Sequence, residues 1–470
     1  MRRAWLLTAL SVPVLLALLA AVFVARVDVA SQVVAAVQGA TGLDAVVGSA
    51  SFRLDPTAHV ALKSVRLTGK GLEIASVGEA DVGLAFWPLL RRRVVVTRLD
   101  ARGVALALER DREGRLSFAG APQSDRARPA MSLDHVSLTK TSFRYVNRQS
   151  DSELAARDCT VDLDDVRLAE GSGADFMQRL SLSGHSVCAE AHDDRFSGTD
   201  VRSTIVGEHG IARIAPLTMR IMGGDGSGSV DVDMTGRIPS YRVHYAVSRM
   251  QVDGLARSLA AEKMRGEGML EFAAQLTMRG RNSMELRRTA GGEVTLRGTN
   301  LEMSIGDLDE KLSHYEASQN FNLVDLGAFL IAGPVGAAAT KGRDFARVIE
   351  GNQGTTHIGV LMSQWKVEGG VAHAQDAAMA TKENRLAMQG SLDFVNRRYE
   401  DVIVAKVDSH GCATVTQRIG GAFNKPDIER PNVLVALSGP VHSLITKAAK
   451  ALGAKCDVFY AGSVQPPTSP

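Results

Sequence analysis

The chain has 470 residues, with 54 basic and 52 acidic side chains and a formal net charge of +2. This near balance argues against the broad cationic surface that nucleic-acid binding uses, so no nucleic-acid partner is expected. Aromatic residues make up only 5% of the chain and glycine occurs 45 times, a composition that favours many turns and an aliphatic, β-rich interior.

The first segment is an uncharged run from Ala4 to Ala25 that follows Arg2 and Arg3. A run of ~20 apolar residues can span a bilayer, and basic residues before it favour a cytoplasmic N-terminus. Residues 1–26 are therefore predicted to be a single-pass transmembrane anchor. The alternative is a cleaved signal peptide, whose apolar core is usually shorter, at ~7–15 residues.

A short juxtamembrane helix is predicted over 27–42, because Ala30, Val33, Val34 and Val37 share one helical face. From Ser51 onward the apolar residues alternate with polar ones, which is typical of strands with one buried face. The domains predicted after the helix are an N-terminal β region (43–120), a central β region (121–285), a C-terminal β region with helices (286–464) and a disordered tail (465–470).

The alternation recurs in several stretches of the chain. One example places Leu217, Met219 and Ile221 before the glycine-rich "GGDGSGS", predicted to be a hairpin turn, and Val230 and Val232 after it. Helical spacing interrupts the alternation at 252–264, 307–315, 323–352 and 441–452. Within the third of these, 326–339 is too short to span a membrane and is predicted to be packed or interfacial.

The four cysteines form no C-x-x-C pair, which argues against a zinc ribbon or a thioredoxin-like site. Disulfides or buried thiols are the remaining interpretations. If bridges form, proximity in sequence favours Cys159 with Cys188 and Cys412 with Cys456, although four cysteines allow three connectivities.

Motifs of catalysis are absent from the sequence. It contains no G-x-S-x-G elbow, no H-E-x-x-H, no P-loop and no dinucleotide-binding glycine motif. His410 and Cys412 are the histidine and cysteine that stand closest together in the sequence, and no third candidate metal ligand is nearby. The chain is therefore predicted not to be an enzyme and to need no cofactor or metal.

Two regions carry a resemblance to a known family. The first runs from "GSASFRLDPTAHVALKSVRLTG" through "GEADVGLAFWPLLRRR" to "VVVTRLDARGVALALERDREGRLSF", with a Leu-Leu-basic strand end at Leu89, Leu90 and Arg91 and a turn at Glu109, Arg110 and Gly114. The second comprises "GGEVTLRGTNLEM", "GVLMSQWKVEGGVAHAQDAAMATKENRLAMQGSLDF" and "CATVTQRIGGAFNKPDIE". In order and character these regions resemble the AsmA family of bacterial envelope proteins, which is related to chorein-type bridge-like lipid transfer proteins.

The resemblance implies a mostly β fold: an N-terminal transmembrane helix, then an elongated, curved, taco-like groove of antiparallel strands with a few short helices. It implies a protein of the bacterial inner membrane with the bulk of the chain in the periplasm. Phospholipids are the expected partners, with an outer-membrane or periplasmic protein as a further one. The residues expected to line the lipid groove are Val82, Leu84, Phe86, Val104, Leu106, Leu108, Leu217, Met219, Ile221, Val230, Val232, Met234, Leu270, Phe272 and Leu276.

The stretch "FWPLLRRR" is interpreted as a strand end at the membrane side of such a groove. Pro88 cannot donate to a strand ladder, and Trp87 suits a boundary between apolar and polar surroundings. Arg91, Arg92 and Arg93 are candidates for contact with anionic headgroups, at ~1 kcal/mol for each basic residue near an anionic surface. A solvated basic turn is the alternative.

Two further alternatives remain open. A closed sandwich or a row of ordinary β domains would produce the same alternation. A non-enzymatic envelope scaffold that assists outer-membrane protein assembly would use the sheet edge to dock proteins. Only a lipid carrier needs a continuous apolar concavity.

Overall fold

The structure is a computed structural model. It describes residues 43–55, 57–69, 71–90, 95–113, 131–149, 151–170, 176–193, 196–258, 265–304, 306–310, 312–313, 354–429, 432–433 and 456–467. The predicted anchor 1–26, the predicted helix 27–42, the arginines 91–93, the helical predictions at 323–352 and 441–452 and the end of the predicted tail lie outside these residues. Among the described residues, no helix combines the length and apolar character needed to cross a membrane.

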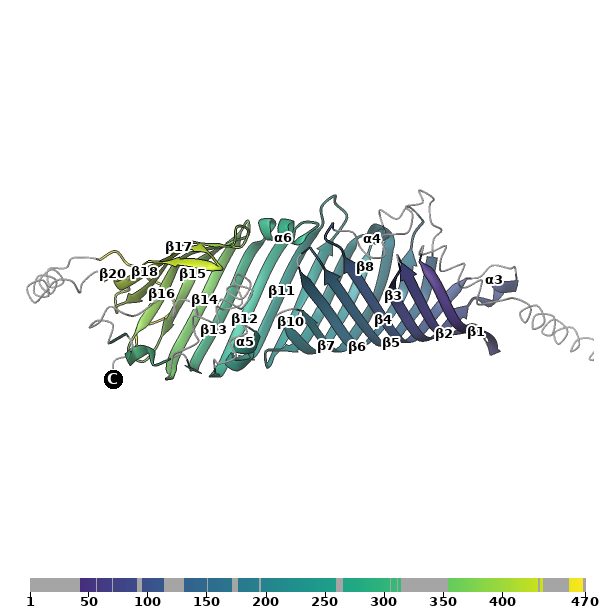
Figure 1. The fold of residues 1–470 in the computed structure, drawn as a ribbon, viewed down its shortest axis with the longest axis horizontal. Helices are drawn as coiled ribbons and strands as arrows, with labels where there is room; N and C mark the ends of the chain where they lie inside the picture. The colour runs from purple at the N-terminus through teal and green to yellow at the C-terminus, as the bar shows by residue number, and fades with distance from the viewer. Residues whose placement is uncertain are drawn as a thin grey trace, which may run out of the picture. The chain divides into compact units, whose positions relative to one another are not determined.

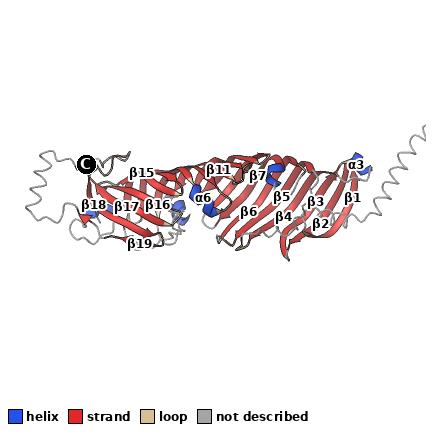
Figure 2. Ribbon diagram, turned by 90° about the horizontal axis from the view of Figure 1, so that it is seen from above, coloured by secondary structure: helices blue, strands red, loops and turns tan. Residues whose placement is uncertain are grey.

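The fold is mostly β: its strands belong to one open sheet, accompanied by a few short helices (Figures 1 and 2). The chain divides into two compact units, residues 1–191 with 205–209, and residues 192–204 with 210–470. The strand β8 (Ser197–Glu208) contributes residues to both units. Each unit is described by itself below.

Unit 1 contains seven complete or nearly complete strands among its described residues. Antiparallel pairing joins β1 to β2, β2 to β3, β3 to β4 and β5 to β6, and the disulfide Cys159–Cys188 links β6 to β7. The strands are β1 (Asp44–Asp55), β2 (Thr57–Gly69), β3 (Leu72–Leu84), β4 (Val96–Arg110), β5 (Met131–Asn147), β6 (Ser152–Leu168) and β7 (Leu180–Asp193), and the short helices are α3 (Phe86–Leu90) and α4 (Phe176–Arg179).

The pairing of β4 with β5 is parallel, with Leu99 opposite Val136 and Leu106 opposite Phe143. The prediction of a purely antiparallel sheet is therefore wrong at this position. Parallel neighbours need a connection of a dozen or more residues, and the stretch between Arg110 and Met131 is long enough to supply it.

One residue is left out of the pairing at the same level in four adjacent strands of unit 1. The residues left out are Gly48, Ser64, Gly78 and Gly103; they lie opposite one another, and the register is the same on both sides of them. Ser64 and Gly103 have φ values of 53° and 67°, outside the extended region of a strand. Because the unpaired positions are aligned, the pairing of neighbouring strands continues unshifted beyond them.

Unit 2 is an antiparallel meander in which every strand from β9 to β18 pairs with the next one. In Figure 1, β10 to β14 lie side by side in chain order. Both β19 and β20 pair with β18. The elements are β9 (Ile211–Ile221), β10 (Gly224–Asp233), β11 (Ser240–Gln251), α5 (Val252–Ser258), β12 (Gly266–Arg279), α6 (Ser283–Thr289), β13 (Gly291–Met303), β14 (Thr356–Glu368), β15 (Val371–Ala380), β16 (Arg385–Asp393), β17 (Arg398–Val407), β18 (Ala413–Ala422), β19 (Lys425–Ile428) and β20 (Asn432–Val433).

The predicted helix over 252–264 corresponds to α5, which ends at Ser258 in the described part. Of the helix predicted over 307–315, residues 308–310 and 312–313 are helical. The predicted glycine turn is shorter than expected: the turn between β9 and β10 is Met222 and Gly223, with φ values of 51° and 77°. Two successive residues with positive φ match the twist of a hairpin, so the remaining glycines of "GGDGSGS" belong to strand β10.

Candidate functional site

One face of the sheet in unit 1 carries apolar side chains in rows that cross several strands. Side chains paired across neighbouring strands point to the same face of a sheet. The register therefore aligns Phe52, Val60, Val82, Leu99, Val136 and Leu163 in one row, and Ala45, Leu67, Ala75, Leu106, Phe143 and Ala156 in another.

The aligned unpaired residues explain how this apolar face continues along each strand. Leu62 and Val65 are both buried although they are three positions apart, because Ser64, with its positive φ, shifts the alternation by one. The same shift keeps Ala101 and Val104 on one face around Gly103. Without it, the second half of each strand would present its apolar residues to the opposite face.

Burial on this face varies within unit 1. Ala58, Val60, Leu62, Val65, Ala80, Leu84 and Ala101 form a buried cluster. The predicted residues Val104, Leu106 and Leu108 on β4 are only half-buried, as is Val82. This part of the face is therefore neither a closed core nor fully open to solvent.

Phe86 departs from the prediction. Strand β3 ends at Leu84, and Phe86 begins the short helix α3, where its side chain is 43% exposed and packs edge-to-face on Trp87 at 5.8 Å between ring centroids. Trp87 itself is 76% exposed. The alternation of residues 80, 82, 84 and 86 therefore predicts a strand that is one step too long. Pro88 ends the strand earlier, because its missing N–H and fixed φ suit the first turn of a helix rather than a strand ladder.

In unit 2 the same arrangement brings together the predicted residues of three strands, β9, β10 and β12. Leu217 and Met219 lie opposite Gly228 and Gly226, and Val230 and Val232 lie opposite Val243 and Tyr241. One row contains Leu217, Gly228, Tyr245, Ala274, Val294 and Trp365, and a second contains Met219, Gly226, Val247, Phe272, Leu296 and Ser363. Ile221, Leu270 and Leu276 belong to the same face, whereas Met234 follows the last residue of β10.

The side chains at the β9–β10 end of these rows are half-buried. Leu217, Met219, Val230 and Val232 have intermediate exposure, and none of them belongs to a buried cluster among the described residues. Together with Val243 they form a surface that we term the half-buried face. Apolar surface of this kind in a soluble domain commonly marks a site of interaction.

Tyr245 brings a buried polar hydroxyl to the strands of this face. An ideal Cβ on Gly226 would stand 2.2 Å from the Tyr245 hydroxyl, and one on Gly228 would stand 2.6 Å from the ring. The two glycines of β10 thus leave the space that the tyrosine occupies, as glycine does where another group must approach the backbone closely. The hydroxyl is buried without a hydrogen-bond partner among the described residues, and burial raises the pKa of Tyr245 to about 12.

At the other end of the rows the same face is covered by protein. Trp365, at 1% exposure, packs in a core with Met379, Leu386 and Val404, and its indole N–H donates to the Ser363 hydroxyl at 2.8 Å. The same core includes Leu255 of α5 and two residues from the segment after β13, Leu308 and Leu312. This end of the rows is therefore part of a buried core, unlike the half-buried face.

The opposite face of β15 to β17 is also covered, by the segment 456–467, which we term the C-terminal strap. Tyr460 and Val464 of the strap pack on Ala378, Ala387 and Ala405. The strap is attached through the Cys412–Cys456 disulfide and through a β-bridge between Cys412 and Val458. Both disulfides pair the cysteines that are nearest in sequence.

Buried polar groups hold the strap in place. The Tyr460 hydroxyl donates to Asp376 Oδ1 at 2.5 Å, and the Ser463 N–H donates to Asp376 Oδ2 at 2.9 Å. Arg385 donates to the Val464 carbonyl at 3.0 Å and lies over the Tyr460 ring at 5.5 Å. These contacts assign a structural role to "CDVFYAGSV", a stretch that no sequence motif explains.

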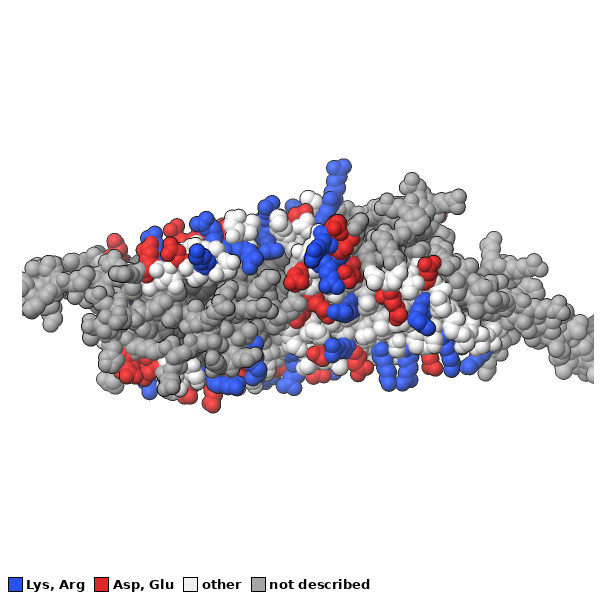
Figure 3. Space-filling model, in the orientation of Figure 1, with Lys and Arg blue, Asp and Glu red and all other residues white. Residues whose placement is uncertain are grey.

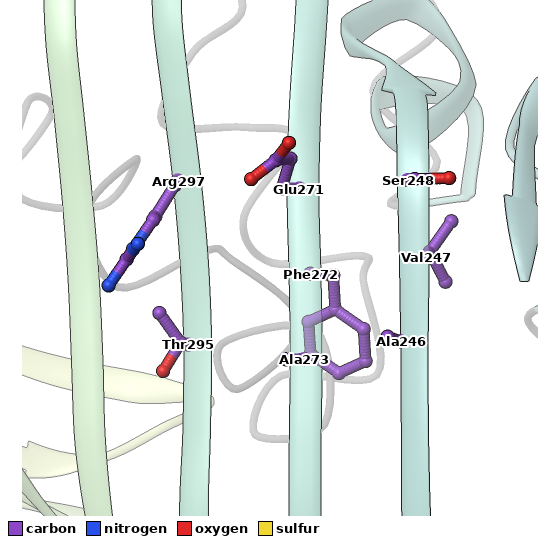
Figure 4. A pocket seen from close by; sticks show the side chains of 8 residues that line it. All are labelled: Ala246, Val247, Ser248, Glu271, Phe272, Ala273, Thr295 and Arg297. Atoms are coloured by element: carbon purple, nitrogen blue, oxygen red, sulfur yellow. The ribbon is translucent and has the colours of Figure 1, made fainter. Parts of the chain in front are cut away.

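A pocket of about 430 Å³ lies at β11 to β13. Its small and charged side chains, Ala246, Ser248, Glu271, Ala273, Thr295 and Arg297, alternate with the apolar rows and so belong to the polar face. Glu271 and Arg297 are directly opposite in the register, yet Figure 4 shows the Arg297 side chain extending away from Glu271. Of the predicted residues, only Phe272 lines this pocket.

The polar face of unit 1 contains a constellation that the sequence motifs did not reveal. His59 Nδ1 lies 2.8 Å from Asp81 Oδ1, and the Thr57 hydroxyl contacts His59 Nε2. This hydroxyl, imidazole and carboxylate are in the order used for nucleophilic catalysis. Hydrolysis also needs donors for an oxyanion and a pocket for substrate, and the pocket described above consists of unit 2 residues. Only the three-dimensional pairing of β2 with β3 brings Asp81 to His59.

Two other histidines pair with aspartates on this polar face: His135 Nδ1 lies 2.8 Å from Asp164, and His185 Nε2 lies 3.4 Å from Asp162. Among the described residues, no group of three or more His, Cys, Asp or Glu side chains is placed to hold a metal ion. On the side of the molecule seen in Figure 3, acidic and basic side chains of the described residues are interspersed. The charge of this surface therefore does not indicate a polyanionic partner.

In comparisons with known proteins, no family model and no curated protein matches this chain.

Proposed function

We propose that this chain is a periplasmic protein anchored in the bacterial inner membrane. In this proposal it binds phospholipid acyl chains on the apolar face of its sheet and supports lipid transport to the outer membrane or outer-membrane homeostasis. The observation that carries the proposal is the half-buried face of β9 and β10, where Leu217, Met219, Val230 and Val232 share one side of the sheet without joining a buried cluster.

The size and chemistry of this face suit an acyl chain. Adjacent strands lie ~4.8 Å apart, so a row across four strands is roughly 14 Å wide. Burial of each methylene contributes about 0.8 kcal/mol, and the rows contain aliphatic and glycine residues that a flexible chain can pack against. The face has no fixed polar pattern that would select a peptide or a sugar.

The curved, groove-like form is part of the same proposal. The aligned unpaired residues Gly48, Ser64, Gly78 and Gly103 are consistent with it, because the apolar face continues along each strand on both sides of them. The apolar N-terminal run and the resemblance to the AsmA family support the anchor and the envelope location. A trough that is apolar inside and polar outside would shield acyl chains from the aqueous periplasm.

The test is native mass spectrometry of the full chain, purified from bacterial envelopes in a mild detergent, with quantification of co-purified phospholipid. Val230→Asp places a carboxylate on the half-buried face, and Ser227→Asp places one on the exposed, opposite face of the same strand. A second matched pair is Leu276→Asp and Gln275→Asp on β12. We expect the two apolar-face variants to bind at least about tenfold less lipid than the wild type, because removing a carboxylate from water beside an acyl chain is energetically unfavourable.

The two control variants should retain lipid within about twofold. Intact disulfide masses and an unchanged far-UV circular dichroism spectrum would show that each variant has folded. A folded wild-type chain that carries no phospholipid would overturn the proposal and favour the scaffold alternative, in which the apolar face packs on a partner protein. Equal lipid loss in both members of a pair would also contradict it.

A further inference from the structure

The strands of the half-buried face carry a buried hydrogen-bond donor, the hydroxyl of Tyr245, that has no hydrogen-bond partner among the described residues. Tyr245 of β11 stands in the row between Gly228 and Ala274, with Val243 and Val247 two residues away on the same face. Its hydroxyl is buried and has no partner among the described residues. A phenylalanine would fill the same space without leaving a polar group unsatisfied.

The glycines beneath the ring leave the space that the tyrosine occupies. The hydroxyl lies over Gly226, where even one methyl group would collide with it at 2.2 Å, and the ring lies over Gly228. Rotation of the side chain away from Gly226 would turn the hydroxyl toward a ligand lying along the row. A tyrosine needs a hydrogen-bond acceptor when its hydroxyl is removed from water.

We propose that the Tyr245 hydroxyl donates a hydrogen bond to the ester carbonyl of a bound diacyl lipid and so makes this face selective for ester-linked over ether-linked chains. The inference rests on the proposed function, because it requires an acyl chain on the half-buried face. It adds a specificity-determining residue to a surface that is otherwise selective only for apolar character.

An ester carbonyl fits this position better than a headgroup phosphate. The residues around Tyr245 on this face are apolar or glycine, namely Gly226, Gly228, Val230, Val243, Val247, Phe272, Ala274 and Leu276. A phosphate placed there would bring a charge into apolar surroundings with no cation to pair with it. A carbonyl oxygen is neutral and accepts a hydrogen bond from a neutral phenol, the form that the raised pKa of Tyr245 preserves up to high pH.

The experiment measures binding of two synthetic lipids to the full chain in detergent, by competition against a fluorescent acyl probe. The lipids are dioleoyl phosphatidylglycerol and its diether analogue, which share headgroup, phosphate and chains and differ only in the carbonyls. We expect the wild type to prefer the diester by about five- to tenfold, the range of one hydrogen bond. Tyr245→Phe should abolish that preference while it leaves diether binding unchanged.

Tyr241→Phe is the matched control, because Tyr241 lies four residues away on the same strand and face, opposite Val232; this variant should keep the preference. A preference that persists in Tyr245→Phe, or a wild type that binds both lipids equally, would overturn the inference and leave the proposed function intact. Failure of both lipids to displace the probe from any variant would instead contradict the proposed function itself. An unchanged or raised urea midpoint for Tyr245→Phe would show that the variant is folded.

Discussion

The apolar side chains of β9 and β10 and those of β14 to β16 follow the same strand alternation but have different surroundings. Leu217 and Val230 are half-buried on one face of a single sheet layer, whereas Trp365 and Met379 are fully buried in a core cluster that also contains residues of α5 and of the segment after β13. At β15 to β17 even the second face is covered, by the C-terminal strap. Alternation therefore predicts which side chains share a face, but it does not predict what covers that face.

The composition of the second face marks the difference. On β15 to β17 the strap packs on alanines, with Ala378, Ala387 and Ala405 in contact with Tyr460 and Val464. On β10 and β12 the equivalent positions are polar and exposed, as at Ser227 and Gln275. Small side chains allow a covering segment to approach the sheet closely, so this covered end is a structural core and the half-buried face is the part of unit 2 available to a ligand.

The largest effect is expected from truncation of the covered core. Trp365→Ala should lower the free energy of unfolding by about 3–5 kcal/mol, because it removes a fully buried aromatic side chain. Phe272→Ala, in a partly buried position on the same face, should cost about 1–2 kcal/mol. Urea unfolding followed by circular dichroism compares the two, and equal losses would mean that the half-buried face is as tightly packed as the core.

A smaller effect is expected from release of the strap. Replacement of Cys412 and Cys456 by serine should destabilise unit 2 by about 2–4 kcal/mol, the usual range for loss of a disulfide. Cleavage by a protease under native conditions, mapped by mass spectrometry, should then appear first within residues 456–467. The pair Cys159→Ser and Cys188→Ser, in unit 1, serves as the control. Strap cleavage of equal rate in both double variants would contradict the assignment.

The smallest effect concerns alkaline pH. Burial, and next the hydrogen bond to Asp376, raise the pKa of Tyr460 above its usual value. A raised pKa in the folded state means that the stabilisation is complete below the unfolded value of about 10 and is lost as the pH rises beyond it. The free energy of unfolding of the wild type should therefore decline as the pH rises above ~10, and Tyr460→Phe should have a flatter pH dependence of stability.

Absorbance at 295 nm, compared between wild type and Tyr460→Phe, isolates the titration of this phenol. A tyrosine that ionises near pH 10 in the folded protein would show that the strap does not shield it.

Much of the fold follows from residue patterns. Alternation predicts the strands that carry Leu217, Val230 and Phe272 and places them on one face, and sequence proximity favours the two disulfide pairings that form. The errors have local physical causes. The strand ends before Phe86 because Pro88 favours a helical turn, and "GGDGSGS" is mostly strand because its glycines make room for Tyr245.

A signal for the aligned unpaired residues was present in the sequence. Apolar residues spaced by three, as in Leu62–Val65 and Ala101–Val104, interrupt the spacing of two at corresponding points of successive strands. Spacing alone, however, cannot distinguish a bulge from a strand end. The parallel pairing of β4 with β5 has no local signal, because the direction of a strand depends on the path of the connection before it.

The sequence by itself determined the β class of this protein and the apolar face of most strands, because side-chain direction in a strand follows from a period of two residues. Only the tertiary structure decided which parts of that face are covered. Trp365 is buried in a core cluster that includes residues of α5 and of the segment after β13, and Ala387 packs against the strap from the end of the described chain. Contacts between residues so distant in sequence depend on the path of the whole chain, which no local pattern encodes.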